Sequence, residues 1–174
     1  MGHDSTAGGP GETGDPQFEA ALLKERIYAT ITMISVVIGL RAAGHVDAAG
    51  AAATLGTTAV GLWLAAVVAD QQAHRVVHGR LATGRELRAM LSVSSPLLLS
   101  AAGPLVLVAA AAAGVMAVDT ALLAAAVVSV AALFGWGCYG GVRMGGGTLA
   151  ALLAGALDAA IGLTVALVKA TAGH

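Results

Sequence analysis

One acidic residue lies near the middle of a long apolar stretch at the end of this chain. Between Gly147 and Ala170 the only charged residues are Asp158 and, close to the end, Lys169. A carboxyl group inside a membrane-spanning helix can take up and release a proton or bind a cation. The alternative is a structural role, in which a protonated carboxyl joins two helices by a hydrogen bond. Both interpretations require a side chain that faces protein or water, because a charge at the bilayer centre costs about 2.5–3.5 kcal/mol.

Helical spacing predicts that Asp158 faces a neighbouring helix. Residues at three- and four-residue steps share one face of a helix. The face of Asp158 carries four small residues: Gly155, Ala159, Gly162 and Ala166. Small residues let another helix approach closely. No basic residue is expected at the same depth, so hydroxyl groups are the expected neighbours. We therefore select Thr57 and Thr58, with Asp158, as a candidate ion or proton site.

A second group of chemically active residues lies in the segment "DQQAHRVVH". Asp70, His74 and His78 are four residues apart and share one face of a helix. Histidine and carboxylate side chains can bind a metal such as zinc, or titrate near neutral pH. Three ligands spread over two helical turns, about 12 Å, cannot all reach one ion, although neighbouring pairs can. The alternative, which we favour, is a solvated helix end near lipid head groups.

The composition indicates what kind of protein holds these residues. The chain has 174 residues, of which 57% are hydrophobic and 11% are charged. A soluble domain has about 25% charged residues, so this chain cannot cover a globular surface with polar groups. We therefore expect an integral membrane protein in contact with the lipid bilayer. The net charge of −1 gives no sign of nucleic-acid binding, and the single cysteine, Cys138, excludes an intramolecular disulfide.

The uncharged runs predict an all-α bundle of five transmembrane helices, since each spanning helix needs about 20 apolar residues. The predicted spans are 27–44, 48–70, 89–116, 120–142 and 146–169. Residues 1–17 have the composition of a disordered tail, and 18–174 form the transmembrane domain with a cytoplasmic loop at 71–88. Pro96 and Pro104 each remove a backbone hydrogen bond, which predicts a kink in the third span.

The basic residues predict the orientation of this bundle. Those on the side of the N-terminus are Lys24, Arg26, Arg75, Arg80, Arg85, Arg88 and Arg143, against Arg41 and Lys169 on the other side. Basic residues are enriched on the cytoplasmic side of membrane proteins, so we expect the N-terminus inside and the C-terminus outside. A cleaved signal peptide in the first span is the alternative, but the net acidic segment before it favours an uncleaved helix.

The stretches "ERIYATITMISVVIGL" and "GLWLAAVVADQQAH" resemble small multi-pass membrane proteins of high-GC bacteria. The resemblance covers the first two spans. It implies a bacterial cytoplasmic membrane as the location and implies no particular activity.

The function expected from these residues is that of a small channel- or transporter-like protein in which Asp158 responds to protons or cations. So short a chain is expected to form a homo-oligomer if it is to enclose a pathway. The alternative is a non-transporting scaffold or a subunit that packs against another membrane protein. No combination of nucleophile, base and orienting group is present, and the glycine-rich segment 135–147 lacks the Gly-Lys-Ser/Thr of a phosphate-binding loop. We therefore predict neither an enzyme nor a cofactor.

Overall fold

The computed structural model describes residues 16–172, and in this range it contains only helices and the turns between them. The helices are α1 (Pro16–Ala43), α2 (Ala48–His78), α3 (Arg85–Leu99), α4 (Ala102–Ala112), α5 (Val118–Arg143) and α6 (Gly147–Ala172). Five stretches are long and apolar enough to cross a membrane, with α3 and α4 together making one of them. The prediction of an all-helical protein with five candidate spans is confirmed at this level.

The helix ends differ from the predicted spans mainly in the first half of the chain. Most of the predicted tail, 1–17, lies outside the described residues, and α1 already begins at Pro16, a residue that suits the first turn of a helix. The second helix continues well beyond residue 70, into the predicted loop. It ends where Gly79 adopts a left-handed conformation (φ 67°) and donates its N–H to the carbonyl of Arg75.

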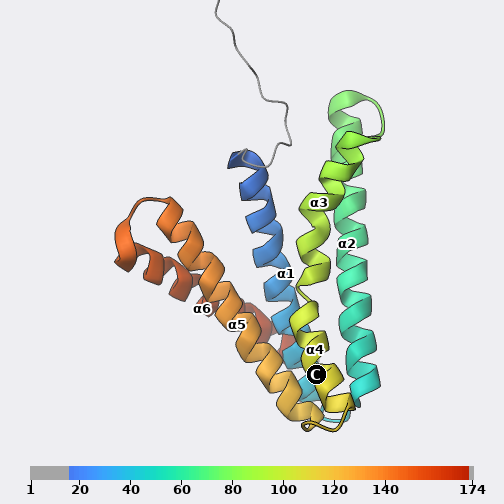
Figure 1. The fold of residues 1–174 in the computed structure, drawn as a ribbon, viewed down its shortest axis with the longest axis vertical. Helices are drawn as coiled ribbons and strands as arrows, with labels where there is room; N and C mark the ends of the chain where they lie inside the picture. The colour runs from blue at the N-terminus through green and yellow to red at the C-terminus, as the bar shows by residue number, and fades with distance from the viewer. Residues whose placement is uncertain (1–15, 173–174) are drawn as a thin grey trace, which may run out of the picture.

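The predicted kink in the third span lies between α3 and α4 (Figure 1), where Ser100 and Ala101 keep helical dihedral angles but the regular backbone hydrogen bonding is interrupted. Pro104 lies in the first turn of α4 and has no N–H for the carbonyl of Ser100, so one helical hydrogen bond is lost at this point. Pro96 lies inside α3, further from the interruption. The carbonyl of Ser92, which Pro96 leaves without a backbone donor, instead accepts a hydrogen bond from Oγ of Ser95 at 2.8 Å.

Helix α1 lies between two groups of helices (Figure 1). On one side, α2 packs against α3 and α4; on the other, α5 and α6 form the most extensive helix pair of the molecule, and both contact α1. The start of α1, the α2–α3 turn and the α5–α6 turn all lie toward the same end of the bundle. The basic residues of these three segments therefore gather at that end.

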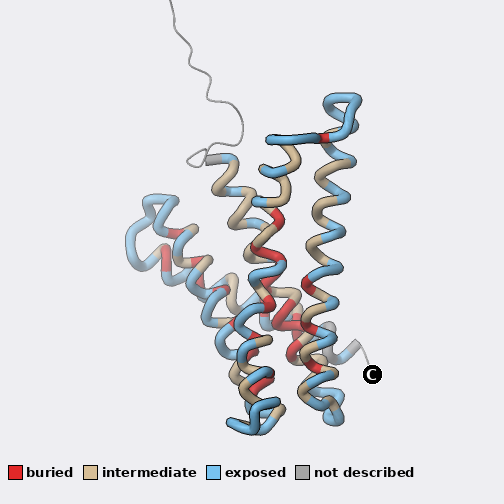
Figure 2. Tube along the Cα trace, turned by 45° about the vertical axis from the view of Figure 1, so that its right-hand side comes forward, coloured by how far each residue is buried: buried red, intermediate tan, exposed pale blue. Residues whose placement is uncertain are grey.

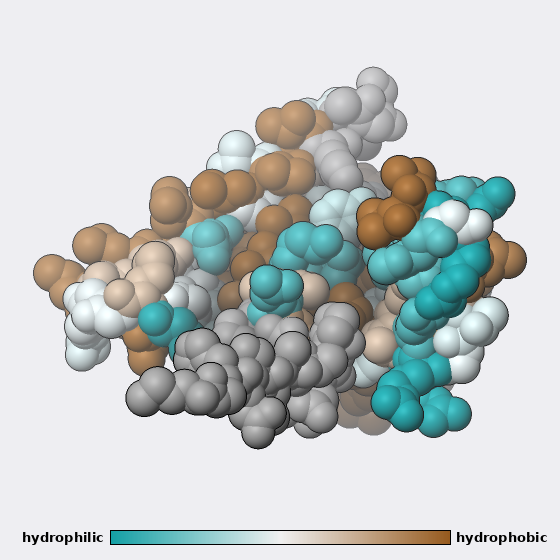
Figure 3. Space-filling model, turned by 90° about the horizontal axis from the view of Figure 1, so that it is seen from above, coloured by the Kyte–Doolittle hydropathy of each residue, from teal (hydrophilic) through white to brown (hydrophobic). Residues whose placement is uncertain are grey.

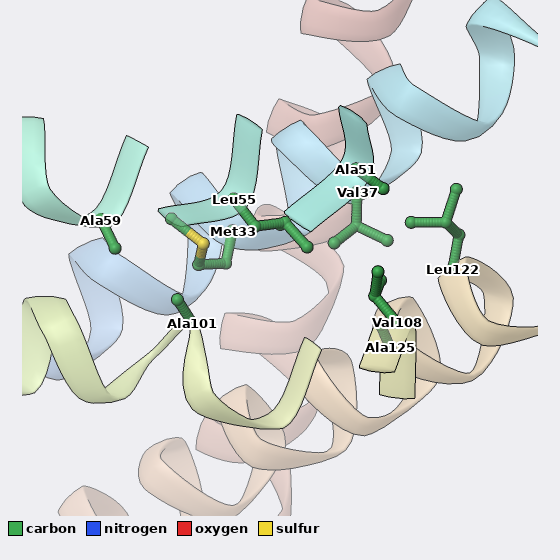
Figure 4. Close-up of a cluster of buried hydrophobic side chains, with 9 residues drawn as sticks. All are labelled: Met33, Val37, Ala51, Leu55, Ala59, Ala101, Val108, Leu122 and Ala125. Atoms are coloured by element: carbon green, nitrogen blue, oxygen red, sulfur yellow. The ribbon is translucent and has the colours of Figure 1, made fainter. Parts of the chain in front are cut away.

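Buried residues lie where the helices contact one another, while exposed residues cover the turns and much of each helix (Figure 2). Seen from the basic end, apolar side chains form the flanks of the molecule and polar ones gather over the α2–α3 turn (Figure 3). The main apolar cluster consists of Met33, Val37, Ala51, Leu55, Ala59, Ala101, Val108, Leu122 and Ala125 (Figure 4). Because more than half of these are alanine or valine, the helices meet with little side chain between them.

Candidate functional site

Asp158 lies in the contact between α6 and α5, and its side chain is half-buried there. A β-carbon placed on Gly137 of α5 would lie 2.6 Å from Oδ2 of Asp158 and 2.7 Å from the α-carbon of Gly155. The carboxylate therefore occupies space that exists only because residue 137 has no side chain. The small-residue face of α6 does turn toward a neighbouring helix, and that helix is α5.

Other glycines of α5 and α6 bring the two backbones equally close. A β-carbon on Gly155 would lie 2.5 Å from Sγ of Cys138 and 2.6 Å from the carbonyl oxygen of Phe134. A β-carbon on Gly141 would lie 2.5 Å from the α-carbon of Ala151. The glycine-rich segment of α5 thus serves close helix packing, and the thiol of Cys138 is part of that contact.

The structure does not bring Thr57 and Thr58 to Asp158 within one chain. Both threonines lie on α2, which packs against α1, α3 and α4, whereas α6 packs against α5 and α1. The hydroxyl of Thr57 donates to the carbonyl of Ala53 in its own helix, at 2.7 Å. In the part of the chain that the structure describes, the carboxylate of Asp158 forms no hydrogen bond and no ion pair.

Asp70, His74 and His78 do not converge on a common point. Asp70 accepts a hydrogen bond of 3.4 Å from Oγ of Ser94, while the rings of His74 and His78 lie 4.4 Å apart. Nε2 of His74 lies 3.6 Å from a carboxylate oxygen of Glu86, a neighbour from α3 that helical spacing along α2 cannot reveal. Within residues 16–172, no group of three or more His, Cys, Asp or Glu side chains is placed to hold a metal ion.

Polar contacts instead fix the turn between α2 and α3. Nε2 of Gln71 donates to the carbonyl of Ala82 at 3.2 Å, and the N–H of Ala82 donates to Oε1 of Gln71 at 3.0 Å. Arg80 donates two hydrogen bonds, of 2.7 and 2.6 Å, to the carboxylate of Glu86. These bonds raise the pKa of the Arg80 guanidinium, because the carboxylate stabilises its charged form. The arrangement suits a fixed helical hairpin.

A cavity of about 370 Å³ lies beside the break in the third span, between α1, α3–α4 and α5. Sequence reasoning did not identify it, although the two prolines of the third span were the available signal. Its polar lining residues come from all three sides: Arg26, Thr30, Ser100, Ser129 and Trp136. The cavity therefore combines a gap in helical hydrogen bonding with side chains able to form hydrogen bonds, which is the combination expected of a binding site within a membrane.

Three of these polar side chains form no hydrogen bond or ion pair with a described residue: Arg26, Ser129 and Trp136. The guanidinium of Arg26 lies over the ring of Trp136, 4.6 Å from its centroid, and forms no ion pair with any described residue. Ser129 is only 6% exposed, and no hydrogen bond of its hydroxyl is present among the described residues. By contrast, Thr30 and Ser100 already donate to backbone carbonyls of their own segments, each at 2.7 Å.

A larger cavity, of about 680 Å³, lies between α1, α5 and α6 toward the other end of the bundle. Its lining is apolar apart from Arg41 and Asp119, which form an ion pair of 2.8 Å with each other. Since these two charges satisfy one another, this cavity offers no unpaired polar group, and we place the candidate site in the smaller cavity.

Comparison of the chain with protein families, curated proteins and solved structures finds no match.

Proposed function

We propose that this chain is a small channel- or transporter-like membrane protein whose solute path enters the cavity between α1, α3–α4 and α5. The observation that carries the proposal is the interruption of a spanning helix at Ser100 and Ala101, beside that cavity. Inside a membrane, backbone groups without a helical hydrogen-bond partner are tolerated only where they are buried in protein or line a water-filled space. Discontinuous helices form the substrate sites of many transporters for this reason.

In this proposal the basic end of the bundle faces the cytoplasm of a bacterial cell, in line with the usual bias of basic residues toward that side. Arg26 belongs to the basic end, whereas Ser100 lies at the helix break, and both line the same cavity. The cavity thus leads from the cytoplasmic side toward the interior of the bundle.

Asp158 is the proposed proton- or cation-responsive group, and it acts from outside the cavity. Helix α5 connects the cavity with Asp158, because Trp136 lines the cavity and the next residue, Gly137, contacts the carboxylate of Asp158. A change in the charge of Asp158 alters its fit against Gly137 and can shift α5 at the position of Trp136. A homo-oligomer remains the proposed assembly for so short a chain.

The test is flux through liposomes that contain the purified protein. Wild-type protein should raise proton or ion flux above that of protein-free liposomes, and Asp158→Asn should remove at least nine-tenths of the increase. Asp119→Asn is the matched control, because it removes an acidic side chain from α5 outside both the α5–α6 contact and the smaller cavity. Absence of flux with folded wild-type protein, over a panel of small anions, cations and neutral solutes, would reject the proposal.

A non-transporting scaffold, or a subunit of a larger membrane complex, is the second candidate. It is favoured by the position of Asp158, which lies in a close helix contact and lines none of the cavities described above. In that case neither wild-type protein nor Asp158→Asn conducts. Native mass spectrometry from mild detergent would then show an oligomer or a bound membrane protein that Asp158→Asn loses.

A further inference from the structure

We infer that the cavity beside the broken third span binds a small anion, held between the guanidinium of Arg26, the hydroxyl of Ser129 and the N-terminus of α4. This inference rests on the proposed function only for its claim that the anion is also the transported solute. The site itself is argued from the unpaired groups that line the cavity.

The first observation is the charge of Arg26. Among the other arginines of the basic end, Arg80 pairs with Glu86 and Arg143 pairs with Glu19, whereas three more have no carboxylate partner among the described residues and lie outside the cavity: Arg75, Arg85 and Arg88. Arg26 has none among the described residues and instead lies over Trp136. No acidic residue lines the cavity. An arginine presents several N–H donors in a fixed plane, which suits an anion, and its unpaired charge makes the cavity electropositive.

The second observation is the N-terminus of α4. This helix has 11 residues, begins at Ala102, and has no side-chain cap. Gly103 and Pro104 of its first turn line the cavity. The first N–H groups of a helix have no acceptor within the helix, and the helix dipole places partial positive charge there. Such an end favours an anion.

The third observation, independent of the other two, is the hydroxyl of Ser129. This side chain comes from α5, is 6% exposed and lines the same cavity without a hydrogen bond to any described residue. The hydroxyl oxygen is reached from the cavity, so it can donate a hydrogen bond to a ligand held there. An anion supplies an acceptor for that bond.

The size of the cavity limits the ligand. A volume of about 370 Å³ corresponds to roughly a dozen water molecules at ~30 Å³ each. Chloride, acetate or phosphate fits with some of its water, whereas a large metabolite does not. The same anionic chemistry has two sources, a free ion in solution or the phosphate of a lipid head group, since Arg26 lies toward the basic end of the bundle.

The experiment uses the fluorescence of Trp136, because the chain has only two tryptophans and Trp63→Phe leaves it as the sole reporter. The protein in phosphatidylcholine nanodiscs is titrated with chloride, acetate and phosphate at constant ionic strength, with bulky gluconate as the replacement ion. We expect a saturable change in emission. Anion-induced thermal stabilisation serves as a second readout that does not depend on the indole.

The variants separate the contributions to binding. Arg26→Gln should weaken apparent affinity at least tenfold and Ser129→Ala several-fold, while Arg26→Lys, which keeps the charge, should stay within a few-fold of the parent. Arg88→Gln and Ser92→Ala are matched controls, because they remove the same groups from α3 outside the cavity and should change nothing.

A response to either source of the anion supports the site, provided that the response depends on Arg26. Saturation by a soluble ion in phosphatidylcholine identifies a free ion, and a response only in phosphatidylglycerol nanodiscs identifies a lipid head group. No response in either lipid, or an equal response in Arg26→Gln, overturns the inference. Anion binding without any flux would keep the site and reject transport, whereas flux that Arg26→Gln leaves unchanged, without anion binding, would keep transport and reject the site.

Discussion

Oδ2 of Asp158 lies where a side chain on Gly137 would have to be, 2.6 Å from the position of such a β-carbon. The position of the Asp158 carboxylate on α6 thus depends on the absence of a side chain at Gly137 on α5. The same approach brings the α-carbon of Gly155 within 2.7 Å of that position. The carboxylate is therefore set against backbone, and any larger residue at 137 must displace α6 as well as Asp158.

Gly137→Ala should destabilise the protein by forcing α5 and α6 apart. The added methyl group would also lie 3.0 Å from the carbonyl oxygen of Ala154, and backbone atoms cannot rotate away from it. Overpacking of this kind costs about 1–3 kcal/mol. The measurement is the free energy of unfolding in mixed detergent micelles. Gly135→Ala is the control, since a β-carbon there meets nothing within 4 Å, and equal stability of the two variants would contradict the described contact.

The five candidate spans could be predicted because each depends on local composition alone. An uncharged run long enough to cross a bilayer must be helical in lipid, whatever it packs against. The face of α6 that carries Asp158 could be predicted for a related reason, since glycine and alanine spacing marks where a second backbone fits. The identity of that second helix, α5, depends on long-range packing and could not be predicted.

The helices that surround the candidate sites could not be predicted from the sequence. Thr57 and Thr58 were selected because they lie at a similar predicted depth to Asp158, yet depth along the membrane normal says nothing about which helices are neighbours. The cavity requires α1 and α5 to meet the break in the third span from two sides. Two prolines predict the break, but only the packing of three helices creates the space beside it.

Gln71→Ala should loosen the turn between α2 and α3. The backbone of Ala82 is buried, and both its N–H and its carbonyl have Gln71 as their side-chain partner. Each buried group left without a partner costs about 1–3 kcal/mol. Hydrogen exchange of the Ala82 amide should therefore accelerate. Gln72→Ala is the control, because the side chain of Gln72 only accepts an exposed hydrogen bond of 3.3 Å from Arg75. Similar exchange rates of the Ala82 amide in both variants would show that the two Gln71–Ala82 hydrogen bonds contribute little to the turn.

Leu133→Ala should create a cavity where α5 meets α1 and α6. Leu133 is fully buried and forms a cluster with Ile34 and Ala166. Truncation of a buried leucine costs about 2–5 kcal/mol, depending on how far the neighbours relax. Unfolding in mixed micelles measures the loss. Leu153→Ala, on the exposed face of α6, should change stability by less than about 0.5 kcal/mol. Comparable losses in the two variants would place Leu133 outside the core.

Pro104→Ala should rejoin α3 and α4 and thereby close the candidate site. Alanine at this position supplies an N–H to the carbonyl of Ser100, and proline is about 3 kcal/mol worse than alanine inside a helix. We expect slower hydrogen exchange over 99–103, unchanged or higher thermal stability, and loss of the anion-dependent signal. Pro96→Ala is the matched control, because Pro96 is also buried beside the cavity yet already lies within the continuous helix α3. If Pro104→Ala leaves exchange over 99–103 unchanged, the break is held by the packing of α1 and α5 around it, and proline only accommodates it.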